Sequence, residues 1–137
     1  MLPWVYLFIG LYKRIKSMSN NAYVIYYNPK CGKCRTAKTA LESAHMECEI
    51  TEYLKEVPDK KTLKNLFTLL GKKPLDVIRK KEDIFKDKYA GKNLSDDQWI
   101  DAIIQHPILL ERPIIVGKNK AWVARDPETL QHIIEEK

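Results

Sequence analysis

The sequence predicts an α/β protein whose mixed four-stranded sheet is built from a βαβ unit and a ββα unit, with a helical block inserted between them. A β-branched and aromatic run at 23–27, a helical apolar pattern and an alternating run at 48–53 predict the βαβ unit. Residues 63–89 have helical spacing, and 113–123 have the pattern of a hairpin. This order of elements is a thioredoxin-like arrangement.

The first helix is predicted after Gly32, because small and apolar residues then recur at helical spacing: Ala37, Ala40, Leu41 and Ala44. Asn28-Pro29 ends the preceding strand. Since one helix connects the strands at 23–27 and 48–53, the two strands should be parallel.

The middle of the chain reads as helical. One helix is indicated by apolar residues at i, i+3, i+4 and i+7: Leu63, Leu66, Phe67 and Leu70. Gly71 is placed to end that helix, and 75–89 should hold one or two short helices. Ser95 and Gln98 form a capping box for the next helix, which should stop before His106-Pro107.

The last part of the chain predicts two strands and a helix. Residues 113–116 and 121–123 form the hairpin strands around a four-residue loop. Asp126-Pro127 supplies a cap and a first-turn proline for the final helix. Its buried stripe should consist of Leu130, Ile133 and Ile134.

Length and composition point to one compact domain. The chain has 137 residues, of which 45% are hydrophobic and 31% charged, which excludes a disordered chain and a membrane bundle. The net charge is +6, but residues 1–17 hold three basic residues and no acid, so the other 120 residues carry only +3. This weak basic balance suits a small anionic substrate better than a nucleic-acid track.

Residues 1–17 are expected to lie outside the folded domain, which would then span 18–137. Met1 to Tyr12 is apolar but shorter than the ~20 residues that cross a bilayer, and it lacks the features of a secretory signal. Because Met18 precedes the first strand, an upstream mis-start is our hypothesis. The basic residues behind the apolar run leave a membrane-surface anchor as the alternative.

The chemistry-bearing motif is Cys31-Gly32-Lys33-Cys34, at the turn between the first strand and the first helix. A thiol there should have a lowered pKa, because the helix dipole and basic neighbours stabilise the thiolate. The free N–H groups of a helix start also bind oxyanions. The motif could therefore supply a nucleophile and a cradle for its anionic target.

Two other interpretations stay open from the residues alone. Cys31, Cys34, His45 and Cys48 have an acceptable zinc-ligand spacing, although a regular helix would hold His45 far from Cys34. Alternatively, the two motif cysteines are inert. Cys48 itself is expected in the core of the second strand. Three cysteines and no signal peptide favour a reducing compartment, the cytoplasm.

Arginine is scarce among the basic residues, which makes its positions informative. Arg112 directly precedes Pro113 at the hairpin start, and Arg125 follows the hairpin. Guanidinium groups suit tetrahedral oxyanions because they donate parallel hydrogen bonds. The three histidines form no cluster: His45 and His132 should face solvent from helices, and His106 should end its helix.

With these motifs in order, the chain resembles the glutaredoxin-dependent arsenate reductases of the ArsC/Spx family, from about residue 22 to residue 136. The resemblance is carried by four stretches: Asn28-Pro29-Lys30-Cys31-Gly32, Val77-Ile78-Arg79-Lys80, Gln105-His106-Pro107-Ile108-Leu109 and Arg112-Pro113-Ile114-Ile115-Val116.

The resemblance implies a role for several residues. Cys31 would be the catalytic cysteine, which attacks arsenate. Arg79, Arg112 and Arg125 would hold the oxyanion, and Pro113 would be the cis-proline of thioredoxin-like folds. Glutathione would act as co-substrate and glutaredoxin would complete the reduction to arsenite, with no bound cofactor, no metal and no direct nucleic-acid contact.

The chain departs from that pattern at two positions. The family's arsenate reductases have His at Tyr27 and Ser at Cys34. We therefore expect Cys34 to resolve the Cys31 adduct as an internal disulfide, which thioredoxin or glutaredoxin could reduce. The CxxC motif is also similar to the Spx branch of redox-sensing regulators that bind RNA polymerase, but that branch typically lacks the third arginine, so Arg125 favours the reductase. A general thiol-disulfide oxidoreductase is the other alternative.

Overall fold

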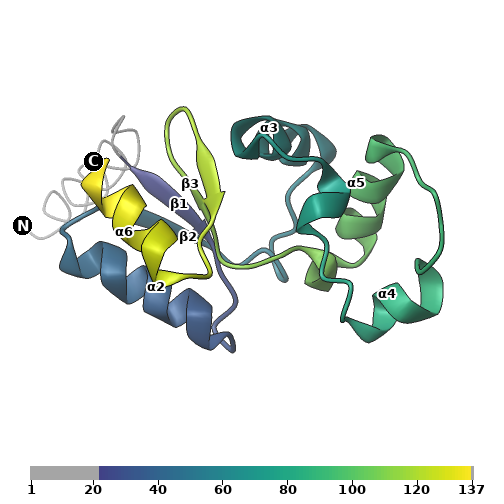
Figure 1. The fold of residues 1–137 in the computed structure, drawn as a ribbon, viewed down its shortest axis with the longest axis horizontal. Coiled ribbons are helices and arrows are strands. Elements are labelled where there is room, and N and C mark those ends of the chain that lie inside the picture. Colours follow the sequence, from purple (N-terminus) through teal and green to yellow (C-terminus); the bar gives the residue numbers. More distant parts are fainter. Residues whose placement is uncertain (1–21, 137) are drawn as a thin grey trace, which may run out of the picture.

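The computed structural model describes residues 22–136, and the proposed boundary after residue 17 lies outside this range. Its elements, labelled as in Figure 1, follow in chain order: β1 (Tyr23–Tyr26), α2 (Gly32–Ser43), β2 (Cys48–Thr51), α3 (Lys60–Leu70), the 3₁₀ turn η1 (Pro74–Val77), α4 (Asp83–Lys88), α5 (Asp96–Gln105), the 3₁₀ turn η2 (Pro107–Leu109), β3 (Ile114–Val116), β4 (Ala121–Val123) and α6 (Pro127–Glu135).

The sheet has the strand order β2-β1-β3-β4. β1 and β2 are parallel, with Tyr23 opposite Cys48, whereas β3 is antiparallel to both β1 and β4. The predicted α/β class, the mixed sheet and the thioredoxin-like order are therefore confirmed. The strands are shorter than expected, because the chain leaves the sheet before Tyr27 and after Thr51.

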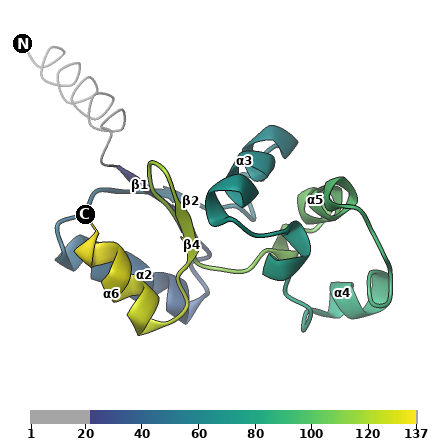
Figure 2. The ribbon, with the colours of Figure 1, turned by 45° about the horizontal axis from the view of Figure 1, so that its top comes forward.

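The two faces of the sheet carry separate cores, because successive strand residues point to opposite sides. Ile25 and Ile115 pack on the face that α2 and α6 cover. Tyr26 and Ile114 belong to the other core, together with side chains of the inserted helices. Figures 1 and 2 show α2 and α6 together on one side of the sheet, and α3 and α5 on the other.

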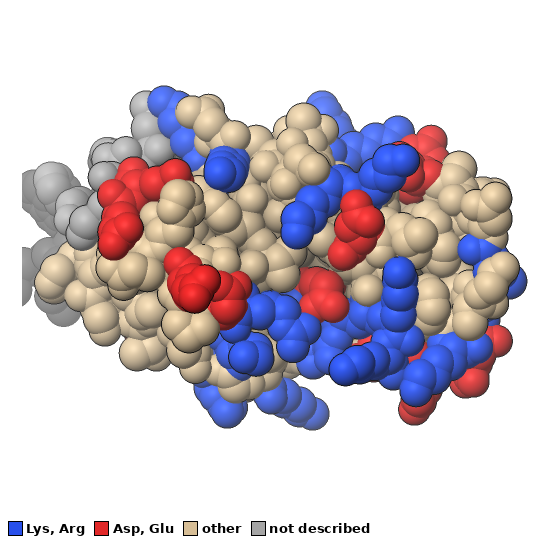
Figure 3. All heavy atoms as spheres, viewed as in Figure 1, with Lys and Arg blue, Asp and Glu red and all other residues tan. Residues whose placement is uncertain are grey.

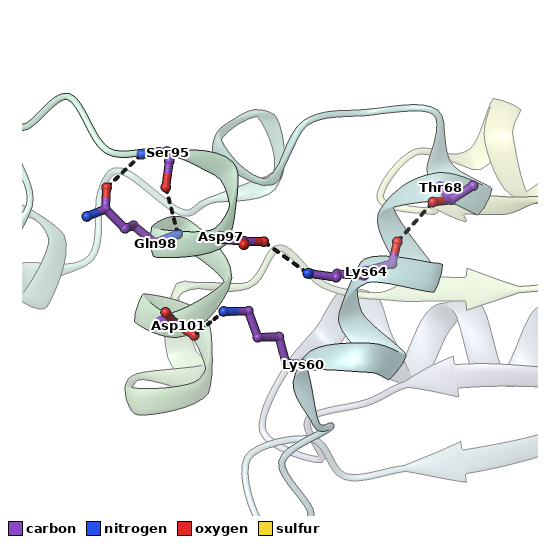
Figure 4. A network of polar contacts seen from close by, with 7 residues as sticks. All are labelled: Lys60, Lys64, Thr68, Ser95, Asp97, Gln98 and Asp101. Carbon is purple, nitrogen blue, oxygen red and sulfur yellow. Dashed lines mark hydrogen bonds and ion pairs between the residues drawn. The ribbon is translucent and has the colours of Figure 1, made fainter.

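The inserted block is held together by caps and ion pairs as well as by its apolar residues. Ser95 and Gln98 form the predicted capping box at the start of α5, with hydrogen bonds of 3.2 and 2.9 Å. Figure 4 shows α3 facing α5 through the Lys60–Asp101 and Lys64–Asp97 pairs, both 3.2 Å. Exposed pairs of this kind each contribute at most about 1 kcal/mol to stability.

The helix ends follow the expected chemistry with one exception. Gly71 ends α3 in the left-handed conformation, with φ 64°, which costs glycine least. The prediction for His45 was wrong: this residue is exposed, but it lies beyond the end of α2 in a turn with φ 58°. His132 is exposed on α6 and His106 ends α5, as predicted.

Candidate active site

The two motif cysteines occupy different environments at the start of α2. Cys31 is the N-cap residue and its side chain is partly exposed, whereas Cys34 is 0% exposed in the first turn. The preceding turn is ordered by Asn28, whose carbonyl accepts from the Cys31 N–H at 2.9 Å and whose side chain accepts from the Lys30 N–H at 3.0 Å. Only Cys31 is therefore open to an external reactant.

The surroundings of Cys31 favour its thiolate. Desolvation would raise the pKa of this thiol, but interactions with the backbone N–H and thiol of Cys34 oppose it, and so do the hydrogen-bonding capacity and charge of Arg112. The result is a pKa below the ordinary value. A lowered pKa at a helix start is typical of nucleophilic cysteines.

Cys34 has the opposite tendency. Desolvation raises its pKa most, and the neighbouring Cys31 raises it further, against lowering by the Asn28 backbone and by Arg112, so that the pKa is about 12. At neutral pH Cys34 is thus a protonated, buried thiol next to a more acidic one. The two thiols interact with each other, and the Cys34 side chain has no exposed surface at which to meet an external reactant.

Backbone hydrogen bonds bring the three predicted arginines onto adjoining segments. The Arg79 N–H donates to Leu109 O at 2.7 Å, which places residue 79 beside the chain that leads to Arg112. The Ala124 N–H donates to Pro113 O at 2.9 Å. Arg125 is the residue after Ala124, so this bond places it beside the segment that contains Arg112. Lys33 of α2 reaches the Arg125 carbonyl at 3.2 Å, which ties this junction to the cysteine motif.

The side chains of these arginines differ in how fully they are paired. Arg79 Nη2 contacts Glu82 at 3.1 Å, and Arg125 Nη1 contacts Glu111 at 2.6 Å. Arg79 Nη1 and two nitrogens of Arg112, Nε and Nη1, are buried without a hydrogen-bond partner among residues 22–136. Donors that the protein leaves unpaired suit an anionic ligand.

Positive charge surrounds this region more widely. Figure 3 shows a band of Lys and Arg along the lower edge of the face that is drawn, from the start of α2 toward α4.

Among residues 22–136, no three His, Cys, Asp or Glu side chains gather where they could hold a metal ion, so the four residues with zinc-ligand spacing do not form such a group.

The sequence profile of the ArsC family matches residues 26–133. The chain belongs to the ArsC family. An arsenate reductase of Neisseria meningitidis is 37% identical over 112 residues, which cover 80% of this chain and 96% of that protein. The uncharacterized protein YfgD of Escherichia coli is also 37% identical over 112 residues, 80% of this chain and 94% of its own.

Solved structures agree with this ArsC assignment. An arsenate reductase from Vibrio cholerae is 37% identical with a TM-score of 0.77, and covers 82% of this chain and 97% of its own. A protein described as an arsenate reductase from Yersinia pestis, 33% identical, has a TM-score of 0.75 and covers 80% and 98%. The similarity therefore extends over nearly the whole of these relatives.

Several expectations from the sequence can be compared with the structure here. The Arg112–Pro113 peptide bond is cis, as the resemblance implied. Cys48 lies in β2 and is only partly buried, against the core under α2 and α6. Among residues 22–136, no helix is long and apolar enough to cross a membrane.

Sequence reasoning missed Tyr53, which belongs to the same neighbourhood. Its side chain is 0% exposed, and its hydroxyl lies near the Arg112 guanidinium without reaching a well-formed hydrogen bond. A topological signal was present. The carboxyl ends of parallel strands meet at one sheet edge, so the segment after β2 had to approach the cysteine motif that follows β1.

Proposed function

We propose that this ArsC-family protein is an arsenate reductase, or reduces a chemically similar oxyanion, with Cys31 as nucleophile and Cys34 as resolving thiol. The observation that supports this proposal most strongly is a pair of unlike thiols beside Arg112: Cys31 is accessible and has a lowered pKa, whereas Cys34 is fully buried and has a raised pKa. The names of the relatives support the substrate class.

In the first step, the Cys31 thiolate attacks arsenic and forms an S–As bond, while one arsenate oxygen takes up protons and leaves as water. Arg112 would stabilise the negative charge on the remaining oxygens, with Arg79 and Arg125 as the neighbouring guanidinium groups. The low pKa of Cys31 keeps the nucleophile ionised at neutral pH.

In the second step, Cys34 gives up its proton, which an oxygen of the departing arsenite takes up, and attacks Cys31 Sγ. An S–S bond forms, the S–As bond breaks, and its electron pair stays on arsenic, which leaves as arsenite. Arsenic gains two electrons and the cysteine pair loses two. Formation of the adduct removes the Cys31 thiolate, which is one cause of the high pKa of Cys34, so the second thiol becomes easier to ionise at this point.

An external thiol must then return two electrons to the disulfide. Glutathione with glutaredoxin, or thioredoxin, would serve, and this chemistry belongs to a reducing compartment such as the cytoplasm. The CxxC pair also supports a second candidate function, general thiol-disulfide exchange, in which the oxyanion plays no part.

The test is NADPH consumption with arsenate, glutathione, glutaredoxin and glutathione reductase. Arsenate-dependent turnover should be abolished in Cys31→Ser and strongly reduced in Arg125→Ala. Mass spectrometry after turnover should show a Cys31–Cys34 disulfide, and glutathionylated Cys31 alone would reject the resolving role of Cys34. Cycling of the two cysteines without any response to arsenate would favour the thiol-exchange candidate.

A further inference from the structure

Tyr53 lies in the segment that follows β2, close enough to Arg112 and to both motif cysteines for their charges to act on its hydroxyl. Its side chain is fully buried, and its ring meets the ring of Tyr26 edge-on, with 6.3 Å between centroids. The two rings belong to the core between the sheet and the inserted helices. Packing therefore holds the phenol ring in one place.

The hydroxyl of Tyr53 is buried and has no hydrogen-bond partner among residues 22–136. Arg112, Cys34 and Cys31 are the charged or titratable groups that act on it. Desolvation raises the pKa of Tyr53 to about 12, although Arg112 lowers it, so the hydroxyl keeps its proton at neutral pH. It is consequently a hydrogen-bond donor without an acceptor while both cysteines are reduced.

The burial of the Tyr53 hydroxyl indicates which anion can accept its hydrogen bond. The Tyr53 hydroxyl and the two unpaired Arg112 nitrogens each expose less than 1 Å². An oxyanion that arrives from solvent would first meet Cys31, which is partly exposed. The Cys34 side chain is as fully buried as that of Tyr53, and its charge acts on the Tyr53 hydroxyl. The Cys34 sulfur must become negative before it attacks the Cys31 adduct.

We propose that Tyr53 donates a hydrogen bond to the Cys34 thiolate and stabilises it while Cys34 resolves a covalent adduct on Cys31. The inference rests on the resolving role of Cys34 in the proposed function. Tyr53 keeps its proton throughout. Electrons move only from the Cys34 sulfur into the new S–S bond and from the broken Cys31 bond to the leaving group. Arg112 supplies the positive charge on the same side.

The test separates the two thiols with an aromatic disulfide, 5,5′-dithiobis(2-nitrobenzoate), in a Cys48→Ser background. Cys31 attacks the reagent and releases one thionitrobenzoate, and Cys34 then attacks the mixed disulfide and releases the second. Tyr53→Phe should leave the first phase unchanged. It should slow the second about 10- to 100-fold, the loss expected for a hydrogen bond to a charged group, and raise the pH midpoint of that phase.

The matched control is Tyr26→Phe, which removes the hydroxyl of the neighbouring buried tyrosine and should change neither phase. Tyr53→Phe should also unfold at an unchanged or higher denaturant concentration, because it deletes an unpaired buried polar group. Equal second phases in Tyr53→Phe and the parent, or a slowed first phase, would overturn the inference. Release of only one equivalent by the parent would overturn the resolving role of Cys34 and this inference together, whereas arsenate turnover is tested independently.

Discussion

At the scale of single residues, the two thiols of the site have the same chemistry but different burial and different pKa values. Cys31 and Cys34 are separated by two residues, but the first is the N-cap of α2 and the second faces the core. Arg112 acts on both sulfurs, in each case by favouring the thiolate. The order of ionisation, and hence the choice of nucleophile, follows from burial rather than from residue type.

Replacement of Arg112 should raise the pKa of Cys31. In Arg112→Gln the positive charge and the hydrogen-bonding groups that lower this pKa are lost. The pH at which iodoacetamide alkylates Cys31 at half its maximal rate should therefore move upward. Arg79→Gln is the control, because Arg79 is not among the groups that shift Cys31. A midpoint that moves equally in both variants would contradict a specific effect of Arg112.

Replacement of Glu111 should improve the binding of an oxyanion. The Glu111 carboxylate engages Arg125 at 2.6 Å, and the arginine is 44% exposed. In Glu111→Gln the guanidinium is freed and one competing negative charge is removed, so the KM for arsenate should fall about two- to five-fold, the range expected for an exposed ion pair. The same substitution in an Arg125→Ala background should have no effect on KM, and a fall there would show that Arg125 is not the group released.

At the scale of elements, the helical insert contributes Arg79 to the site, and its helices are capped by residues of their own. The Val77–Arg79 segment pairs with residues 109–111 through two backbone hydrogen bonds and the Ile78–Leu110 bridge. These contacts place Arg79 beside the segment that leads to Arg112. The caps of α3 and α5 fix the helices that support this pairing.

Loss of the α5 cap should destabilise the protein without altering the cysteines. Ser95→Ala removes the acceptor for the Gln98 N–H at 3.2 Å, and should lower the free energy of unfolding by about 1 kcal/mol. Urea denaturation measures the change, with Ser43→Ala at the exposed end of α2 as control. The alkylation midpoint of Cys31 should be unchanged, and a shift there would mean that the α5 cap also positions the site.

At the scale of the whole molecule, two buried or half-buried thiols link folding to alkaline pH. The pKa of Cys34 is about 12 and that of Cys48 is about 11, in both cases chiefly because burial disfavours the charged form. An unfolded chain ionises these thiols near their ordinary value of 9.0. Above that pH the native state binds more protons than the unfolded state, so stability must fall as pH rises.

The free energy of unfolding should accordingly be constant with respect to these thiols below about pH 8 and decline from about pH 9 upward, with a slope approaching 1.4 kcal/mol per pH unit for each retained proton. Urea titrations at a series of pH values measure the slope. Cys34→Ala should show a shallower decline than the parent, and an identical slope would mean that Cys34 does not retain its proton in the native state.

The residues that the sequence identified are those with local signals. The N-cap at Ser95, the glycine at residue 71 and the apolar spacing of α3 depend on near neighbours, so they could be predicted directly. The ArsC motifs likewise predicted the cis bond before Pro113. The short 3₁₀ turn η2 has a weak local pattern and was not predicted, and His45 was expected on a helix but lies in a turn.

The sequence by itself determined the order of elements, the family and the CxxC motif at the start of a helix, because each depends on residue types within one stretch of chain. Only the tertiary structure decided which thiol is buried and which carboxylates form ion pairs with Arg79 and Arg125. It also decided that Arg112 acts on Tyr53. The physical reason is that desolvation and charge act across space, between segments that the fold brings together from distant parts of the chain.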